Sequence, residues 1–183
     1  MTISAWFMDS TDEDQRCEHR KSPNEEVSLE KIASLGVLHW SGITGPEDPK
    51  LAEIQKERGY SYTDIISVCP DKLPGYEDKV KSFFTEHIHY DEEIRYCIEG
   101  NGYFDVRDSN DQWIRIKLEG GDMIILPEGS YHRFTTTESN YIKAMRLFVG
   151  EPVWTPYNRT DIDNDTNESR VKYVSSFLQT ASA

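Results

Sequence analysis

The feature that most restricts the fold of this chain is a change of hydrophobic period near residue 85. Upstream, apolar residues recur three or four positions apart in segments 28–36, 49–58 and 76–84, which predicts three short helices. Downstream, apolar and polar residues alternate in short runs bounded by turn residues, which is typical of strands. Together they predict a mainly β fold, a barrel or sandwich with N-terminal helices. The expected strands are 85–90, 93–99, 102–107, 113–118, 122–126, 131–137 and 141–149.

The length of the chain allows one hydrophobic core. At 183 residues it is long enough for one domain and short for two. Residues 1–25 are mostly polar, and Trp6 and Phe7 are their expected packed anchors. We therefore expect one domain over residues 1–183, with a helical N-terminal part at about 26–84, a barrel core at about 85–150, and an irregular C-terminal strap at 151–183 that frays past Leu178.

The segment 113–118 alternates most clearly. It places Ile114, Ile116 and Leu118 on one face of a strand. Arg115 and Lys117 are expected on the other, polar face.

The charge of the chain limits its partners. The net charge is −13 and the sequence pI is about 4.8, and no Lys/Arg-rich run is present. Binding to nucleic acid or to an anionic membrane surface depends on basic patches, so neither is expected. A small anionic substrate would have to be attracted locally, by a metal ion or a positioned arginine, against the field of the whole protein.

The compartment is expected to be the cytoplasm, with the nucleus as a further candidate. No run of eighteen apolar residues occurs, which argues against membrane insertion, and the N-terminal residues do not resemble a secretion signal. Cys17, Cys69 and Cys97 are scattered and form no C-x-x-C pair, which suits a reducing compartment. No apolar helix stripe suggests a subunit interface, so a monomer is expected.

Three histidines and a glutamate form the candidate metal site. His87 and His89 are two apart in a strand, so both side chains leave the same face. Glu93 follows across a short bend, and His132 begins a later strand. Three imidazoles and one carboxylate suit Fe(II), Ni(II), Co(II), Mn(II) or Zn(II), and six-coordination would leave two positions open, as in catalytic sites. The remaining histidines, His19 and His39, are expected to be structural or solvated.

The spacing around these residues matches two motifs of the cupin superfamily. The first is HxHxxxE followed after six residues by Gly100; the second is Gly121-x5-Pro127-x-Gly129-x2-His132. The closing asparagine of the second motif is replaced by Thr136, which does not affect a ligand. The match implies a cupin barrel, a conical double-stranded β-helix or jelly roll.

Strand alternation gives two further candidates. If Glu93 points at the metal, Arg95 and Cys97 share its face, and Ile94, Tyr96 and Ile98 pack outward. A buried guanidinium needs an anionic partner. That partner is either a substrate anion beside the metal or an interior carboxylate such as Glu86, Asp105 or Glu99. By the same alternation Phe134 lies on the face of His132, either as a wall of the pocket or as a core aromatic.

Beyond these motifs, the sequence resembles the acireductone dioxygenases, and most of all their eukaryotic branch, over roughly residues 3–178. The stretches that carry the resemblance are Ala5–Asp9, Leu35–Leu38, Phe83–Arg107, Gly121–Pro127, Tyr131–Phe134, Lys143–Phe148 and Gly150–Arg159.

The resemblance implies Fe(II) or Ni(II), one per chain, bound by His87, His89, Glu93 and His132. The implied substrates are acireductone (1,2-dihydroxy-3-keto-5-methylthiopentene) and dioxygen, in methionine salvage. The iron form would yield 4-methylthio-2-oxobutanoate and formate, and the nickel form 3-methylthiopropanoate, formate and carbon monoxide. Arg95 would hold the substrate anion and Phe134 would flank its carbon chain. Two alternatives stay open: another cupin metalloenzyme, a dioxygenase or isomerase, and a non-catalytic metal-binding cupin.

Overall fold

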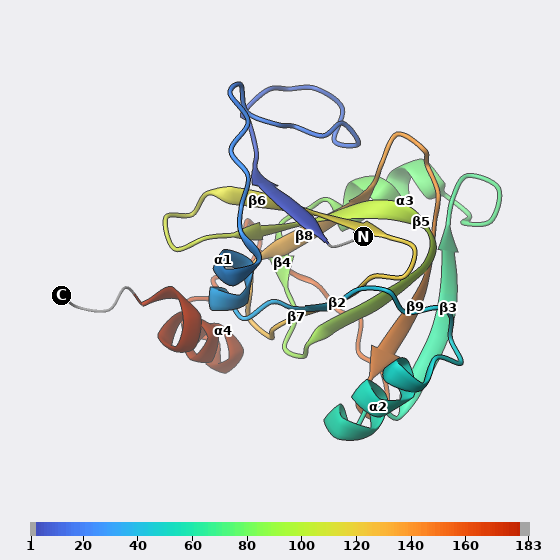
Figure 1. Cartoon of the computed structure of the whole chain (residues 1–183). Coiled ribbons are helices and arrows are strands. Elements are labelled where there is room, and N and C mark those ends of the chain that lie inside the picture. The colour runs from blue at the N-terminus through green and yellow to red at the C-terminus, as the bar shows by residue number, and fades with distance from the viewer. Residues whose placement is uncertain (1–2, 180–183) are drawn as a thin grey trace.

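Residues 3–179 are described by a computed structural model in which strands dominate (Figure 1). The helices are α1 (Leu29–Ser34), α2 (Pro49–Arg58), α3 (Tyr76–Phe83) and α4 (Glu168–Tyr173), the last followed by a π-helical turn, Val174–Leu178. The strands are β1 (Ser4–Phe7), β2 (Leu38–Trp40), β3 (Tyr62–Val68), β4 (His87–Ile88), β5 (Glu93–Arg107), β6 (Trp113–Glu119), β7 (Met123–Leu126), β8 (His132–Thr136), β9 (Ile142–Phe148) and β10 (Tyr157–Asn158). The prediction of a mainly β fold with N-terminal helices is confirmed.

The long strand β5 organises the barrel. Its first half pairs with β7 and β9, and its second half pairs with β6 and β8, all antiparallel. Because one strand serves two sets of neighbours, the sheet curls around a common interior. That interior contains a core of aliphatic and aromatic side chains, among them Phe104, Ile116 and Leu118, which are fully or almost fully buried.

The prediction that β5 is two strands, 93–99 and 102–107, is wrong. The glycines at 100 and 102 suggested a turn, but Gly102 pairs with both Leu118 and Thr136 and the ladder continues. Gly100 instead follows an irregularity of the β5–β9 ladder between Cys97 and Glu99; it has φ +77°, and a Cβ there would lie 2.3 Å from the Tyr141 carbonyl oxygen. Glycine is therefore required by a close backbone approach and not by a change of direction.

The predicted helices are present. The first lies within 28–36 and begins after Ser28, whose side chain accepts a hydrogen bond from the Lys31 amide. The second has the predicted bounds, 49–58, because Asp48 caps its first turn and Gly59, with φ +73°, ends it.

Residues 4–68, ahead of the expected barrel core, also contribute strands that the sequence did not reveal. β1 pairs with β6, β2 with β7, and β3 with β9, so all three extend the barrel sheet. β1 and β2 are too short for alternation to be visible, and their pairing partners lie far along the chain. Trp6, in β1, is fully buried as expected, and Phe7 packs against the core.

The prediction that residues from 151 onward are irregular is partly wrong. Residues 168–178 are helical, and the Asn167 side chain caps the first turn. This helix lies against the second cupin motif: a Cβ on Gly129, which has φ +76°, would lie 2.2 Å from the Ser169 carbonyl oxygen. The expectation of fraying past Leu178 concerns residues that, apart from Gln179, lie outside the described part of the chain.

A second hydrophobic cluster lies outside the barrel, under α2. It joins Leu51 and Ile54 of this helix to Ile94 and Tyr96 of β5. Cys97 packs in the interior cluster. The outward packing predicted for Ile94 and Tyr96 is therefore observed, buried beneath a helix. No helix within residues 3–179 is long and apolar enough to cross a membrane.

The polar face expected for Arg115 is not exposed to solvent. Arg115 is 0% exposed and Asp105 1% exposed, and the two make a pair of hydrogen bonds of 2.8 and 2.9 Å. A loop in residues 9–26 covers this pair, and Arg115 donates to the carbonyl oxygens of Gln15 and Cys17. Arg133 donates to the same Asp105 carboxylate.

Replacing Asp105 by asparagine is expected to lower the free energy of unfolding by about 3–5 kcal/mol, because the buried guanidinium of Arg115 and the partly buried one of Arg133 would lose their counter-charge. Denaturant titration measures this difference. Asp111→Asn is the matched control, since Asp111 is an exposed partner of Arg159 and its loss should cost less than about 1 kcal/mol. Equal effects of the two substitutions would contradict the role given to burial.

Candidate metal centre

Strand pairing brings the predicted metal-site residues together at one end of the barrel. His87 in β4 lies directly opposite His132, the first residue of β8. His89 follows β4, and Glu93 begins β5. The ring centroids of the three histidines are 4.5 to 5.3 Å apart, and one nitrogen from each lies within 4.8 Å of the others. Such a cluster can hold a metal ion.

The outer nitrogen of each histidine is fixed by a backbone carbonyl. His87 Nδ1 is 2.6 Å from the Thr85 oxygen, His89 Nδ1 is 2.9 Å from the Thr155 oxygen, and His132 Nδ1 is 2.9 Å from the Ser130 oxygen. A carbonyl oxygen only accepts hydrogen bonds, so each Nδ1 carries the proton and donates. The lone pair of a neutral ring is then on Nε2, which is the arrangement that metal-binding histidines use.

The surroundings of His132 and His87 show whether these residues suit a metal ion. His132 Nε2 is buried and has no hydrogen-bond partner. A buried nitrogen without a hydrogen-bond partner destabilises the folded protein unless a ligand binds its lone pair. Burial lowers the pKa of His132 to about 3, and burial also lowers the pKa of His87. Both rings are therefore neutral and able to bind a cation at neutral pH.

Glu93 faces the same point from β5. One of its oxygens, Oε2, lies 3.3 Å from His89 Nε2 and 3.9 Å from His132 Nε2. Burial disfavours the charged carboxylate, but Arg95 and His89 outweigh burial and hold the pKa of Glu93 well below its usual range. Burial likewise opposes protonation of His89, but Glu93 outweighs it and raises the pKa of His89. A charged carboxylate thus lies beside His89 and His132, two of the three histidines of the cluster.

Arg95 lies beside Glu93, as alternation predicted, and its partner is Glu93 itself. Arg95 Nη2 is 3.1 Å from Glu93 Oε1, and Nη1 donates to the Ile94 carbonyl oxygen at 2.9 Å. None of the three interior carboxylates considered from the sequence pairs with Arg95. Glu86 binds Arg107, Asp105 binds Arg115, and Glu99 accepts from Tyr141.

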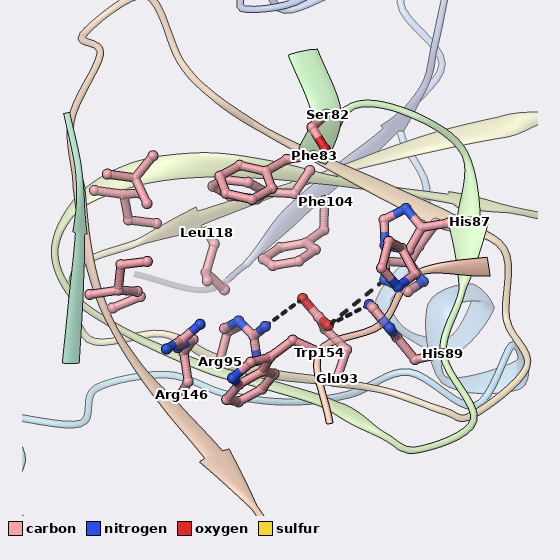
Figure 2. Close-up of a pocket in the computed structure, with 17 residues that line it drawn as sticks. Ser82, Phe83, His87, His89, Glu93, Arg95, Phe104, Leu118, Arg146 and Trp154 are labelled. Carbon is pink, nitrogen blue, oxygen red and sulfur yellow. Dashed lines mark ion pairs between the residues drawn. The ribbon is translucent and has the colours of Figure 1, made fainter. Parts of the chain in front are cut away.

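These residues line a cavity of about 270 Å³ that continues into the barrel (Figure 2). Its wall is mostly apolar. Phe134 lies in this wall, 4.9 Å from Phe104 and 6.2 Å from Phe83 between ring centroids. The lining residues are Ile66, Val68, Ser82, Phe83, His87, His89, Glu93, Arg95, Phe104, Leu118, His132, Phe134, Ile142, Ala144, Arg146, Trp154 and Pro156.

Arg146 and Trp154 also lie in the wall, and neither was singled out from the sequence. Arg146 of β9 donates to Asp64 of β3, with its Nε 2.7 Å from Asp64 Oδ1. Figure 2 shows Trp154 beside both Arg146 and Arg95. The Cζ atoms of the two arginines lie 4.3 Å and 5.3 Å from its ring centroid. Alternation along 141–149 would have placed Arg146 on an inward face with Ala144. Trp154 follows no regular pattern.

The remaining histidines and the cysteines lie away from the cavity wall. His19 is buried, 2.9 Å from Asp9 Oδ1 and 3.0 Å from the Asp14 carbonyl oxygen. His39 pairs with Ile124 in the β2–β7 ladder. All three cysteines are free, which agrees with the absence of a disulfide framework in the sequence.

Comparison with known proteins gives consistent matches. The model of the ARD/ARD' family matches residues 4–156. The chain is 59% identical over 179 residues to acireductone dioxygenase 2 of Physcomitrium patens, covering 97% of this chain and 90% of that protein. It is 57% identical over 170 residues to acireductone dioxygenase of Branchiostoma floridae, covering 93% of this chain and 96% of that protein.

A solved structure is also similar. It is an acireductone dioxygenase from Bacillus anthracis with a cadmium ion in its active centre. The TM-score is 0.62 at 25% sequence identity, over 73% of this chain and 92% of that one. The barrel, the histidine cluster, the family match and the near full-length relatives agree, and the chain belongs to the ARD/ARD' family of the cupin superfamily.

Proposed function

We propose that the protein is a metal-dependent dioxygenase that cleaves acireductone with dioxygen. The observation that carries the proposal is a cluster of three histidines, with the Glu93 carboxylate beside two of them, at the end of a largely apolar cavity. The full-length similarity to acireductone dioxygenases supports the choice of reaction. Residues 1–183 are proposed to act as one domain, which is supported by strands from both ends of the chain, β1 and β10, lying in the same sheet.

His87, His89, Glu93 and His132 are the proposed ligands. A bound divalent cation would supply Lewis acidity that favours the deprotonated enediol of the substrate. The carbonyl oxygens of Thr85, Thr155 and Ser130 keep the three rings oriented, and Arg95 keeps Glu93 charged. With its ligands arranged in this way, the site requires little reorganisation when the cation binds.

Arg95 and Phe134 are the proposed substrate-contacting residues. Arg95 presents the buried positive charge that an anionic substrate needs in a protein of net charge −13. Phe134, with Phe83 and Phe104, provides an apolar wall that excludes water from the reacting carbons. The expected substrates are therefore small molecules, acireductone and dioxygen.

The metal is proposed to be Fe(II) or Ni(II), one per chain, because three imidazoles and a carboxylate satisfy both as six-coordinate ions. The iron form would give 4-methylthio-2-oxobutanoate and formate, and the nickel form 3-methylthiopropanoate, formate and carbon monoxide. The proposed context is methionine salvage, in the cytoplasm and also in the nucleus, with the protein acting as a monomer and without nucleic acid or membrane insertion.

Reloading the metal-free protein separately with Fe(II) and Ni(II) is expected to give these two product sets from one substrate. The protein ligands are the same in both forms, so a difference must come from the metal. Gas analysis for carbon monoxide and mass spectrometry of the acids measure the outcome. Identical products from both forms would refute the dual chemistry and leave the dioxygenase assignment standing.

The function itself is tested by oxygen uptake and substrate loss with acireductone, before and after removal of the metal. Metal-dependent consumption of both substrates is expected. A non-catalytic cupin would bind metal and consume neither. A different cupin enzyme would bind metal and leave acireductone at its uncatalysed rate.

A further inference from the structure

Three cross-strand rows, which follow from the register of β5, β9 and β3, contribute side chains to the wall of the cavity. The row nearest Glu93 joins Arg95, Arg146 and Asp64, and is charged. The next row joins Cys97, Ala144 and Ile66. The last row joins Gly100, Ile142 and Val68. Two residues separate successive rows on β9 and β3, which corresponds to about 7 Å along an antiparallel strand.

The rows differ in what they offer a ligand. The charged row adjoins the candidate metal centre, since Arg95 binds Glu93. Ala144 and Ile66 of the middle row line the cavity, and Ala144 has the smallest side chain of the lining. Val68 and Ile142 of the last row also line it and are both branched and buried. The charged row therefore bounds a recess over Ala144 on one side, and the branched side chains of Val68 and Ile142 bound it on the other.

The opposite wall is apolar as well. Phe104 and Leu118 line the cavity and belong to the interior core, and Figure 2 shows Phe104 between Leu118 and His87. An extended ligand held at the metal end would thus pass from the charged row onto side chains that offer no hydrogen bonds. Such a surface selects for the length and bulk of an apolar chain.

We propose that the row of Ala144 and Ile66 binds the methylthioethyl tail of the substrate, that Ala144 sets the bulk the site accepts, and that Val68 and Ile142 form its end stop. The inference rests on the proposed function and assigns the specificity of the same cavity. The tail has two methylene groups, a sulfur and a methyl group, which fits within one row spacing of about 7 Å. No polar side chain of this row recognises the sulfur, so a butyl tail should replace it.

The test uses acireductone analogues in which the tail on the keto carbon is methyl, butyl or hexyl. For each variant the ratio of kcat/KM between two tails is measured, so that a partial loss of folded or metal-loaded protein cancels. The same analogues are titrated without oxygen by calorimetry, which gives a binding readout independent of turnover. Each methylene that is bound against an apolar wall is expected to contribute about fourfold.

Ala144→Leu is expected to fill the recess and to lower the butyl-to-methyl ratio at least about tenfold, since three methylenes contribute up to about 60-fold in the unaltered site. Ala144→Val is the smaller variant and should lower the ratio less. Ile142→Ala is expected to open the end stop and to raise the hexyl-to-butyl ratio about fifteenfold, the contribution of two methylenes. Ile65→Ala is the control, because Ile65 lies on the outer face of β3 and is 51% exposed, and both ratios should stay unchanged.

The outcomes separate the two proposals. If the unaltered protein consumes all three analogues but neither ratio changes in the Ala144 and Ile142 variants, the tail lies elsewhere and the inference is overturned alone. If the unaltered protein consumes no acireductone, the proposed function and the inference are overturned together. A gain for the hexyl tail in Ile142→Ala supports the assignment, because misfolding cannot produce it.

Discussion

Replacing His132 by alanine is expected to remove bound metal and to lower turnover of acireductone more than about 100-fold. Loss of a group that only orients a ligand costs on the order of 10–100-fold, and loss of the ligand itself should exceed that range. His132 is the most buried of the three histidines, and its Nε2 has no other partner. Glu93→Ala should behave similarly, since it removes the carboxylate that lies beside His89 and His132. Elemental analysis and substrate-loss kinetics measure the two effects.

His39→Ala is the matched control for the histidine substitution. His39 lies in the short strand β2, outside the cavity wall, so metal content and rate should be unchanged. Metal content and turnover at the unaltered level in either His132→Ala or Glu93→Ala would remove that residue from the ligand set. Circular dichroism separates loss of metal from loss of fold.

Arg95→Leu is expected to lower kcat/KM for acireductone by about 30- to 1,000-fold, corresponding to ~2–4 kcal/mol of transition-state stabilisation. Two causes combine. The substitution removes the buried positive charge at the metal end of the cavity, and it frees the Glu93 oxygen that Arg95 holds at 3.1 Å. The second cause should also weaken metal affinity by about 10–100-fold. Kinetics are therefore measured with metal in excess, and metal affinity is measured separately.

Arg95→Lys distinguishes the two causes. It retains a positive charge but not the fork that donates to both Glu93 and the Ile94 carbonyl oxygen. If Arg95→Lys restores substrate binding but not metal affinity, the positive charge acts on the substrate and the two-nitrogen guanidinium geometry acts on Glu93. Arg58→Leu, at a pair with Glu92 outside the cavity wall, is the control and should leave kcat/KM unchanged. An unchanged kcat/KM in Arg95→Leu would exclude any role in the reaction.

Local sequence was sufficient where neighbours along the chain decide the structure. The bounds of α2 follow from Asp48, Pro49 and Gly59, which lie beside the turns that they stabilise or end. The shared face of Glu93 and Arg95 follows from the two-residue repeat of a strand. The fixed spacings around His87 and His132 likewise predicted a common site, because they match the two motifs of the cupin barrel.

The sequence did not predict the pairing register of the strands, nor which segments cover which side chains. Gly100 and Gly102 looked like a turn, and only the approach of Tyr141 explains why the strand continues there. Arg115 looked solvent-facing, and only the loop in residues 9–26 makes it a buried partner of Asp105.

What the sequence alone determined is the chemistry of the centre: which side chains carry imidazole and carboxylate groups, and which of them share a strand face. What only the tertiary structure decided is the environment of that chemistry. The partner of Arg95, the wall position of Trp154 and the three rows from β5, β9 and β3 depend on strands that are distant in the chain. The physical reason is that alternation fixes the direction of a side chain within its strand, whereas pairing between strands fixes what that side chain meets.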